Sequence, residues 1–142
     1  MLRKLMNNEE HIIVNDPVRP HIAFDWRVQN GREVFVLENE NKEIDAVLCI
    51  AYNKDVPTNE GDMDLLNDPN GPIAVAYTVW SYNKGCGRTI INQARDLLKE
   101  RENINRLVTL SPLTEMAKAF HLKNGAKFLN KHFDCQNFEY EL

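Results

Sequence analysis

The 142-residue sequence lacks the features of membrane, secreted and disulfide-rich proteins. No apolar run approaches the ~18 residues that a membrane-spanning helix needs, and no apolar segment follows the basic residues near the N-terminus. We therefore expect neither a membrane anchor nor a signal peptide. The three cysteines, Cys49, Cys86 and Cys135, are odd in number and scattered along the chain. That usage fits a reducing compartment and predicts a cytoplasmic protein without a disulfide framework.

Excess positive charge is also missing, because the formal net charge at pH 7 is −4. A chain of this charge has no basic surface for non-specific contacts, so we do not expect a nucleic-acid partner. Neither a CxxC nor an HExxH spacing occurs, which argues against a bound metal ion. The apolar content of 43% and the charged content of 27% are ordinary for a globular protein. The length predicts one domain over residues 1–142.

Residues 1–32 show no clear pattern. Pro17 and Pro20 interrupt any long helix, and the stretch from Ile22 to Val28 fits either a short helix or a loop. The basic side chains of Arg27 and Arg32 are expected to be solvated at the surface, and the alternative is that they reach the phosphates of coenzyme A or a substrate carboxylate.

The remainder of the chain predicts an α/β fold, because strand-like runs alternate with helix-like patterns. The first two strand patterns predict a hairpin. The run from Ile73 to Trp80 is almost continuously apolar, as in a strand that is buried on both faces. Strands are predicted at 33–37, 44–52, 73–80, 106–110, 126–129 and 137–142, and helices at 89–101 and 111–124.

The second helix pattern carries specific predictions. Ser111 is expected to cap its N-terminus with Pro112 at the first helical position, and Gly125 is expected to end it. Apolar residues recur at helical spacing and place His121 on the buried face. The residues of this predicted stripe are Leu113, Met116, Ala117, Phe120 and His121.

A polar segment at residues 54–71 contains one lysine and five acids, so its net charge equals that of the whole chain, −4. We interpret it first as a solvated connection, since polar loops are normally connections. The alternative is a flap that attracts a basic substrate.

The turn from Tyr82 to Arg88 is the most specific feature of the chain. It joins the apolar strand pattern to a helix pattern through Gly85 and Gly87. Glycines let backbone N–H groups approach a ligand closely, and a helix N-terminus favours negative charge. Lys84 and Arg88 add positive charge at the same place. The turn therefore predicts a ligand that carries phosphate.

Three phosphate-bearing ligands could bind such a turn: the nucleotide of a P-loop, a dinucleotide, and coenzyme A. The GxxxxGK[ST] spacing of a P-loop is absent, and Ile90 replaces the third glycine of the dinucleotide-binding motif GxGxxG. The third ligand is coenzyme A, whose pyrophosphate would lie on the turn from Gly85 to Arg88.

Two motifs make the chain, from about Glu33 to the C-terminus, resemble the GCN5-related N-acetyltransferases (GNAT). The acyl-CoA signature of that family is [Q/R]-x-x-G-x-[G/A] between a strand and a helix. The segment from Tyr82 to Gly87 matches both small positions, with Tyr82 in place of Gln or Arg. In the second motif, N-x-x-A-x-x-x-Y-x-x-x-G-F, Ala117 and Gly125 match. The departures there are Thr114 for Asn, His121 for Tyr and Ala126 for Phe.

The resemblance implies an acyl-CoA N-acyltransferase fold, in which a central mixed, mostly antiparallel sheet is flanked by helices. It implies acetyl-CoA as co-substrate, held where the strand at 73–80 splays from the strand at 106–110, and an amine that attacks the thioester directly. Backbone groups near Val79 and Trp80 would polarise the thioester carbonyl. The implied cofactor-binding residues are Val79, Trp80, Tyr82, Lys84, Gly85, Cys86, Gly87, Arg88, Thr89 and Thr114.

His121 stands where the family's tyrosine protonates the departing thiolate, so the resemblance implies that an imidazolium takes this role here. The alternative is a core histidine whose polar atoms are satisfied by a neighbour. The strand at 73–80 contains no acid that could act as a general base. Tyr77 and Ser111 are the further catalytic candidates, as groups that could order water.

Two functions stay open. The first is transfer of an acetyl group from acetyl-CoA to a small amine or a protein amine. The second is a non-catalytic interaction or assembly protein of the same fold, for example a phage-encoded one, with or without bound CoA. The missing base and the departures at Tyr82 and His121 favour the second function. In either case, the alternating Phe138, Tyr140 and Leu142 could pair with another chain in a homodimer.

Overall fold

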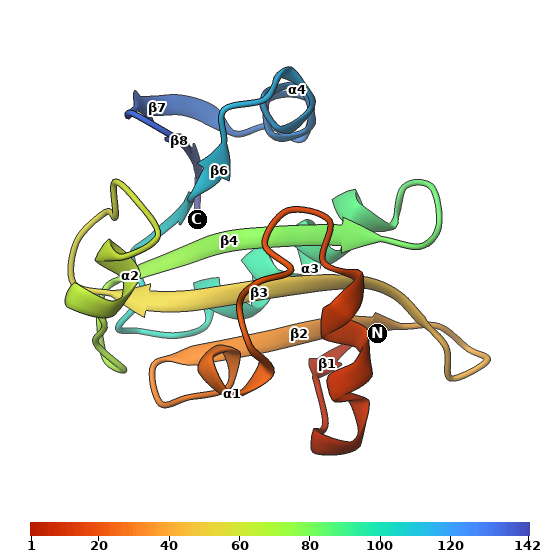
Figure 1. The fold of residues 1–142 in the computed structure, drawn as a ribbon. Coiled ribbons are helices and arrows are strands. Elements are labelled where there is room, and N and C mark those ends of the chain that lie inside the picture. Colours follow the sequence, from red (N-terminus) through yellow and green to blue (C-terminus); the bar gives the residue numbers. More distant parts are fainter.

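A computed structural model describes residues 1–142, and Figure 1 shows its ribbon. Strands form one sheet, and helices lie on both of its faces. The strands are β1 (Leu2–Lys4), β2 (Arg32–Glu38), β3 (Ile44–Asn53), β4 (Ile73–Ser81), β5 (Arg106–Thr109), β6 (Ser111–Pro112), β7 (Lys127–Lys131) and β8 (Cys135–Tyr140). The helices are the 3-10 helix η1 (Asn7–Asn15), α1 (Phe24–Arg27), α2 (Asp62–Leu65), α3 (Cys86–Lys99) and α4 (Glu115–Lys123).

The sheet is mixed and mostly antiparallel, as the family resemblance implies. Its strand order is β1-β2-β3-β4-β5-β8-β6, with β7 paired to β8. Only β4 and β5 run parallel, through residues 73–76 and 106–109. All other pairs are antiparallel, including the predicted hairpin of β2 and β3.

The two faces of the sheet are covered by different parts of the chain (Figure 1). One face packs against α3 through the buried side chains of that helix. The other face packs against the N-terminal segment and α2. The central strand β4 is therefore buried on both sides, which explains its continuous apolar run. The buried side chains of α3 are Ile90, Ile91, Ala94 and Leu98.

A β-bulge interrupts β4. The pairing of β4 with β3 skips Tyr77, so this residue bulges from the ladder. Ala76 packs in the core beneath α3, and the next residue of β4 in that core is Val79, three positions further instead of two. Trp80 packs on the opposite face. The alternation of side chains along β4 thus reverses beyond the bulge.

The predicted start of the second helix is wrong. Ser111 and Pro112 form β6, because their backbones pair with β8. Thr114 caps α4 instead, and its hydroxyl accepts a hydrogen bond from the N–H of Ala117 at 3.1 Å. The sheet pairing outweighs the local Ser-Pro signal for a helix start.

The predicted burial of the α4 stripe is correct at only one end of the helix. His121 is buried, whereas Met116 is 83% exposed and Leu113 is 39% exposed. α3 also begins earlier than predicted, at Cys86 instead of Thr89, because Gly85 already serves as its N-cap residue. No helix has both the length and the apolar character that crossing a bilayer requires.

Candidate functional site

The parallel strands β4 and β5 diverge after a short pairing. Their last backbone hydrogen bond runs from Leu110 N to Ala76 O at 3.0 Å. Beyond it, β4 continues to Ser81 beside β3 alone, while the chain after β5 turns into β6 and pairs with β8. Val79 and Trp80 lie in this part of β4, which has no partner on the β5 side. The predicted splay between the two strands is therefore present.

A buried arginine spans the point of divergence. Nε of Arg19 donates a hydrogen bond to Tyr77 O on β4 at 3.0 Å, and Nη2 donates to Leu110 O at 2.8 Å. Nη1 forms an ion pair of 2.9 Å with Glu60. The Arg19 side chain is only 8% exposed, so its charge depends on these three partners for compensation.

Asp16 and Arg27 hold the backbone of Arg19. Their side chains form an ion pair that is inaccessible to solvent on both sides. The Asp16 carboxylate accepts hydrogen bonds from Arg19 N at 2.8 Å and from the Thr78 hydroxyl at 3.0 Å. Arg27 Nη2 donates to Arg19 O at 2.7 Å. A buried polar cluster thus connects the N-terminal segment to β4.

The expectation that Arg27 and Arg32 are solvated is wrong. Arg27 is fully buried in the ion pair with Asp16. The Arg32 guanidinium lies 3.9 Å from the centroid of the Trp26 ring and pairs with Asp64 at 2.6 Å. Both guanidinium groups are engaged within the protein.

The turn between β4 and α3 presents unpaired backbone donors. Gly85 has a φ of 85°, a left-handed conformation that glycine adopts without strain. The N–H groups of Gly85, Gly87 and Arg88 form no hydrogen bond within the protein. A Cβ at Gly87 would lie 3.1 Å from the Phe120 ring, so this glycine also lets α3 approach α4. Three free N–H groups at a helix N-terminus form a site that suits an anion.

Two cations flank this turn. Lys84 and Arg88 are exposed, and neither takes part in an ion pair. The Thr89 hydroxyl donates to Gly85 O at 3.2 Å and so stabilises the first turn of α3. Cys86 is partly buried against the core, in line with the packing role of a small residue.

The Tyr82 hydroxyl bonds to side chains outside the glycine turn. Its hydroxyl accepts hydrogen bonds from Trp80 Nε1 at 3.1 Å and from Asn15 Nδ2 at 2.9 Å. Trp80 belongs to the core on the face opposite to α3. The residue that departs from the family's Gln or Arg therefore fastens the turn to η1.

His121 is a buried, neutral histidine. Its Nδ1 lies 2.7 Å from the Tyr140 hydroxyl, and its ring stacks on Phe138 with a centroid distance of 5.4 Å. Burial lowers the pKa of His121 to about 4 and raises the pKa of Tyr140 above its usual value. The ring is uncharged at pH 7, so a proton can leave this position only from the neutral pair and not from an imidazolium.

The hydroxyls of the other two catalytic candidates face the protein interior. Ser111 Oγ donates to Thr109 Oγ1 at 2.8 Å, and both residues are buried. The Tyr77 hydroxyl is buried without a hydrogen-bond partner, and its ring meets Trp26 edge-on at 5.5 Å. Tyr77 contributes its carbonyl to the divergence of the strands, through Arg19.

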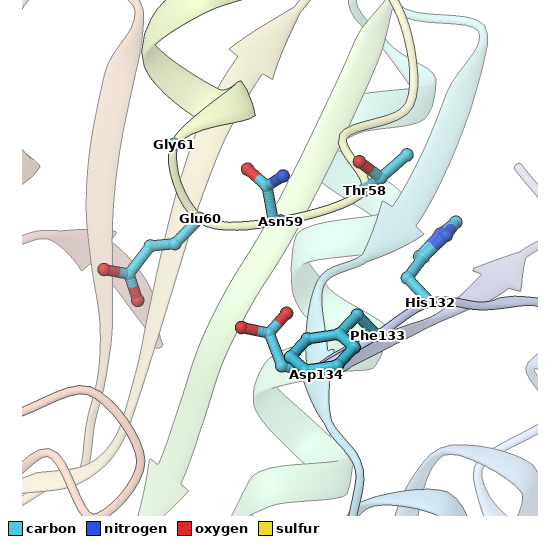
Figure 2. A pocket seen from close by; sticks show the side chains of 7 residues that line it. All are labelled: Thr58, Asn59, Glu60, Gly61, His132, Phe133 and Asp134. Atoms are coloured by element: carbon cyan, nitrogen blue, oxygen red, sulfur yellow. The ribbon is translucent and has the colours of Figure 1, made fainter.

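A cavity of about 570 Å³ opens between the acidic segment and the turn that joins β7 to β8. Figure 2 shows its two walls, with Glu60 and Asn59 on one side and Phe133 and Asp134 on the other. Glu60 also lines a second cavity of about 310 Å³, beside His21. His21 Nε2 lies 2.9 Å from the Glu60 carboxylate. Glu60 thus stands between both cavities and the arginine at the strand divergence.

Sequence reasoning missed Arg19, Asp16 and Glu60. Arg19 lies between Pro17 and Pro20, and the two carbonyls that it contacts are 58 and 91 positions away in the sequence. Glu60 is one of five acids in the segment at 54–71, and no local pattern distinguishes it from the others. No three or more His, Cys, Asp or Glu side chains gather in a group that could hold a metal ion.

Comparison with known proteins identifies the fold. No family model and no curated protein matches the chain. Among solved structures, it is similar to a malonyl-CoA decarboxylase from Agrobacterium vitis, with a TM-score of 0.76 and 15% identity over 100% of this chain. It spans 60% of that decarboxylase chain.

Two further solved structures match over most of their own length. The GphF GNAT-like decarboxylase in complex with isobutyryl-CoA has a TM-score of 0.73 and 14% identity, over 92% of this chain and 87% of that one. The SpeG spermidine N-acetyltransferase from Vibrio cholerae has a TM-score of 0.66 and 18% identity, over 99% and 92%. The fold is therefore that of the GCN5-related N-acetyltransferases, as predicted. Structures of this fold include both acetyltransferases and decarboxylases.

Proposed function

We propose that this protein binds acetyl-CoA and transfers its acetyl group to an amine. The observation that carries the proposal is the set of unpaired N–H groups at Gly85, Gly87 and Arg88, beside two exposed cations. These donors suit the pyrophosphate of coenzyme A. The isobutyryl-CoA complex of GphF, a protein of the same fold, supports an acyl-CoA ligand.

The strand divergence is the proposed path of the pantetheine arm. From Ser81 back to Tyr77, β4 extends over about 13 Å, at ~3.3 Å per residue. The backbones of Val79 and Trp80 line this part of β4 and would bond the arm or the thioester carbonyl. Thr89 and Thr114 remain predicted contacts of the cofactor. At the inner end, the desolvated Arg19 guanidinium would stabilise negative charge that develops on the carbonyl oxygen.

Two of the three cysteines are unsuited to form a covalent acyl intermediate, which favours direct transfer of the acetyl group to the amine. Burial raises the pKa of Cys49 to about 11 and also raises that of Cys135, so both remain thiols, which are poor nucleophiles, at neutral pH. The amine nitrogen would attack the thioester carbon, forming the C–N bond, and the C–S bond would break with its electron pair on sulfur. The amine loses one proton, and the sulfur gains one.

Two groups are proposed for these proton transfers. Glu60, whose carboxylate lies 2.9 Å from His21 Nε2, is proposed as the base that is missing from β4. The His121–Tyr140 pair is the donor to sulfur, with the proton supplied by its neutral members. Tyr77 would position Arg19 through the hydrogen bond that its carbonyl accepts. Ser111 would position Thr109 through the hydrogen bond that its hydroxyl donates.

The alternative function is a non-catalytic protein that binds acyl-CoA. Arg19 favours it, because its guanidinium already occupies the divergence and both carbonyls there are satisfied. Binding of acetyl-CoA without release of free thiol over a broad amine panel would select this alternative.

The first experiment is calorimetric titration with acetyl-CoA. The unmodified protein should bind, and a ligand at about 100 times its dissociation constant should raise the unfolding free energy by about 2.7 kcal/mol. Lys84→Gln and Arg88→Gln should each weaken binding about tenfold, as the loss of a charged hydrogen bond does. Lys99→Gln, at the opposite end of α3, is the matched control and should bind normally. Absence of binding at millimolar acetyl-CoA would refute both the enzyme and its alternative.

A further inference from the structure

The turn between β4 and α3 is held from outside by the start of β3. Asp45 directly precedes Ala46, which pairs with Ser81 at the end of β4. Tyr82 N donates a hydrogen bond to Asp45 O at 2.8 Å. Asn83 Nδ2 donates to the carboxylate Oδ1 of Asp45 at 2.7 Å. One residue of β3 thus binds the first two residues of the turn, and Figure 1 shows both segments at the same end of the sheet.

Asn83 also closes the turn through its backbone. Its carbonyl accepts a hydrogen bond from Cys86 N at 3.2 Å, so residues 83–86 form a β-turn. Gly85 has a φ of 85° and a ψ of −13°, which are close to the angles of the third residue in a type II turn. The position of Asn83 therefore determines where the N–H of Gly85 and the start of α3 lie.

Asp45 is itself held in place. Asn39 Nδ2 donates a second hydrogen bond to the same Oδ1 at 3.1 Å. The side-chain oxygen of Asn39 accepts the N–H groups of Asn41 at 2.8 Å and Glu43 at 3.1 Å, which fastens Asn39 to the turn between β2 and β3. Asp45 is half-buried and takes part in no ion pair. Its carboxylate therefore serves the fold as a hydrogen-bond acceptor and not as a countercharge.

We propose that Asp45 is a positioning residue that holds the turn, through Asn83, in the shape that binds the pyrophosphate of acetyl-CoA. This role rests on the proposed binding of acetyl-CoA. The N–H groups of Gly85, Gly87 and Arg88 are then already ordered in the free protein. A ligand that binds a preformed turn does not have to order it, so less conformational entropy is lost on binding.

The charge of Asp45 has the opposite effect on the same ligand. A carboxylate beside an anion site repels phosphate, whereas a carboxylate that orders the backbone donors favours its binding. Removal of the carboxylate should tighten binding if charge alone matters, and should weaken binding if the position of the turn matters. Because an asparagine oxygen also accepts two hydrogen bonds, Asp45→Asn removes the charge and keeps the acceptor.

Calorimetric titration with acetyl-CoA measures the sign of this effect. Asp45→Ala should weaken binding about tenfold, as the loss of a hydrogen bond to a charged group does. Asp45→Asn should bind at least as tightly as the unmodified protein. Asn83→Ala should weaken binding by the same factor as Asp45→Ala, and the double variant should lose no more than either single variant. Glu40→Gln, which removes an exposed acid from the turn between β2 and β3, is the matched control and should bind normally.

Backbone ¹⁵N relaxation without ligand reports on the turn independently of acetyl-CoA. Residues 83–88 of the unmodified protein should have order parameters of about 0.85, like α3, and Asp45→Ala should lower those of the turn below about 0.6 while α3 stays unchanged. Unchanged order in Asp45→Ala, or tighter binding of acetyl-CoA by this variant, would overturn the proposal.

The same titrations distinguish this role from the proposed function. If the unmodified protein bound no acetyl-CoA, the proposed function would fail, and the role of Asp45 at the pyrophosphate would fail with it. If the unmodified protein and Asp45→Ala bound acetyl-CoA equally well, the proposed function would stand and the role of Asp45 alone would be refuted.

Discussion

Asp16 and Arg27 form an ion pair of 2.7 Å that solvent does not reach, and the pair holds Arg19 from both sides. Asp16 accepts the N–H of Arg19, and Arg27 donates to the carbonyl of Arg19. Arg19, which spans the divergence of β4 and β5, is therefore held in place by a buried ion pair. The position of the Arg19 guanidinium depends on Asp16 and Arg27.

Asp16→Asn should destabilise the protein by about 3–5 kcal/mol, because it leaves the buried Arg27 guanidinium without a countercharge. Urea unfolding followed by circular dichroism measures the change. Asp25→Asn, an exposed acid in α1, is the control and should stay within about 0.5 kcal/mol of the unmodified protein. A loss below 1 kcal/mol for Asp16→Asn would contradict the burial of this pair.

The pH dependence of stability should show the burial of His121. Its pKa is about 4 in the folded chain and about 6.5 when unfolded, so the unfolded chain binds the proton more tightly. The resulting stability is complete above pH 6.5 and is lost as the pH falls from 6.5 towards 4, by about 3 kcal/mol at most. His121→Gln should remove this part of the pH dependence, measured by urea unfolding at pH 7.5 and 4.5. His11→Gln, on the exposed surface of η1, should leave it unchanged.

Gly87→Ala should cost about 1–2 kcal/mol, because the new methyl group would lie 3.1 Å from the Phe120 ring. Phe120→Leu in the same chain should relieve the contact, and a double-mutant cycle should give a coupling energy of at least ~0.5 kcal/mol. Gly61→Ala is the control, because its nearest contact would be 3.4 Å away and its φ is −63°. Additive effects of the two substitutions would mean that α3 and α4 do not meet through this glycine.

The strands of the sheet were predictable because burial on one or both faces leaves a periodic or continuous apolar pattern. β4 and the stripe of α3 follow that pattern closely. The start of α4 was predicted wrongly, because Ser111 and Pro112 satisfy a local rule for helix starts while their backbones pair with β8, which is remote in sequence. Hydrogen bonds to a strand that is distant in the sequence can thus override a local signal for a helix start.

The glycine turn with its unpaired backbone donors could be predicted from sequence, since these donors belong to one short segment of the chain. The rest of the candidate site could not. Arg19 and Glu60 come from different segments and meet β4 only in the folded chain. The charge state of His121 depends on desolvation by its surroundings, which no spacing along the chain encodes.

Tyr77 is one residue more than a regular ladder between β3 and β4 would contain. Deleting Tyr77 would leave Ala76 opposite Ile50 and Thr78 opposite Cys49 in an unbroken ladder, so Val79 and Trp80 would keep their present faces. A deletion elsewhere in β4 would instead turn every following side chain of the strand to the wrong face. A single-codon deletion should therefore be tolerated better at this point than at any other in the strand.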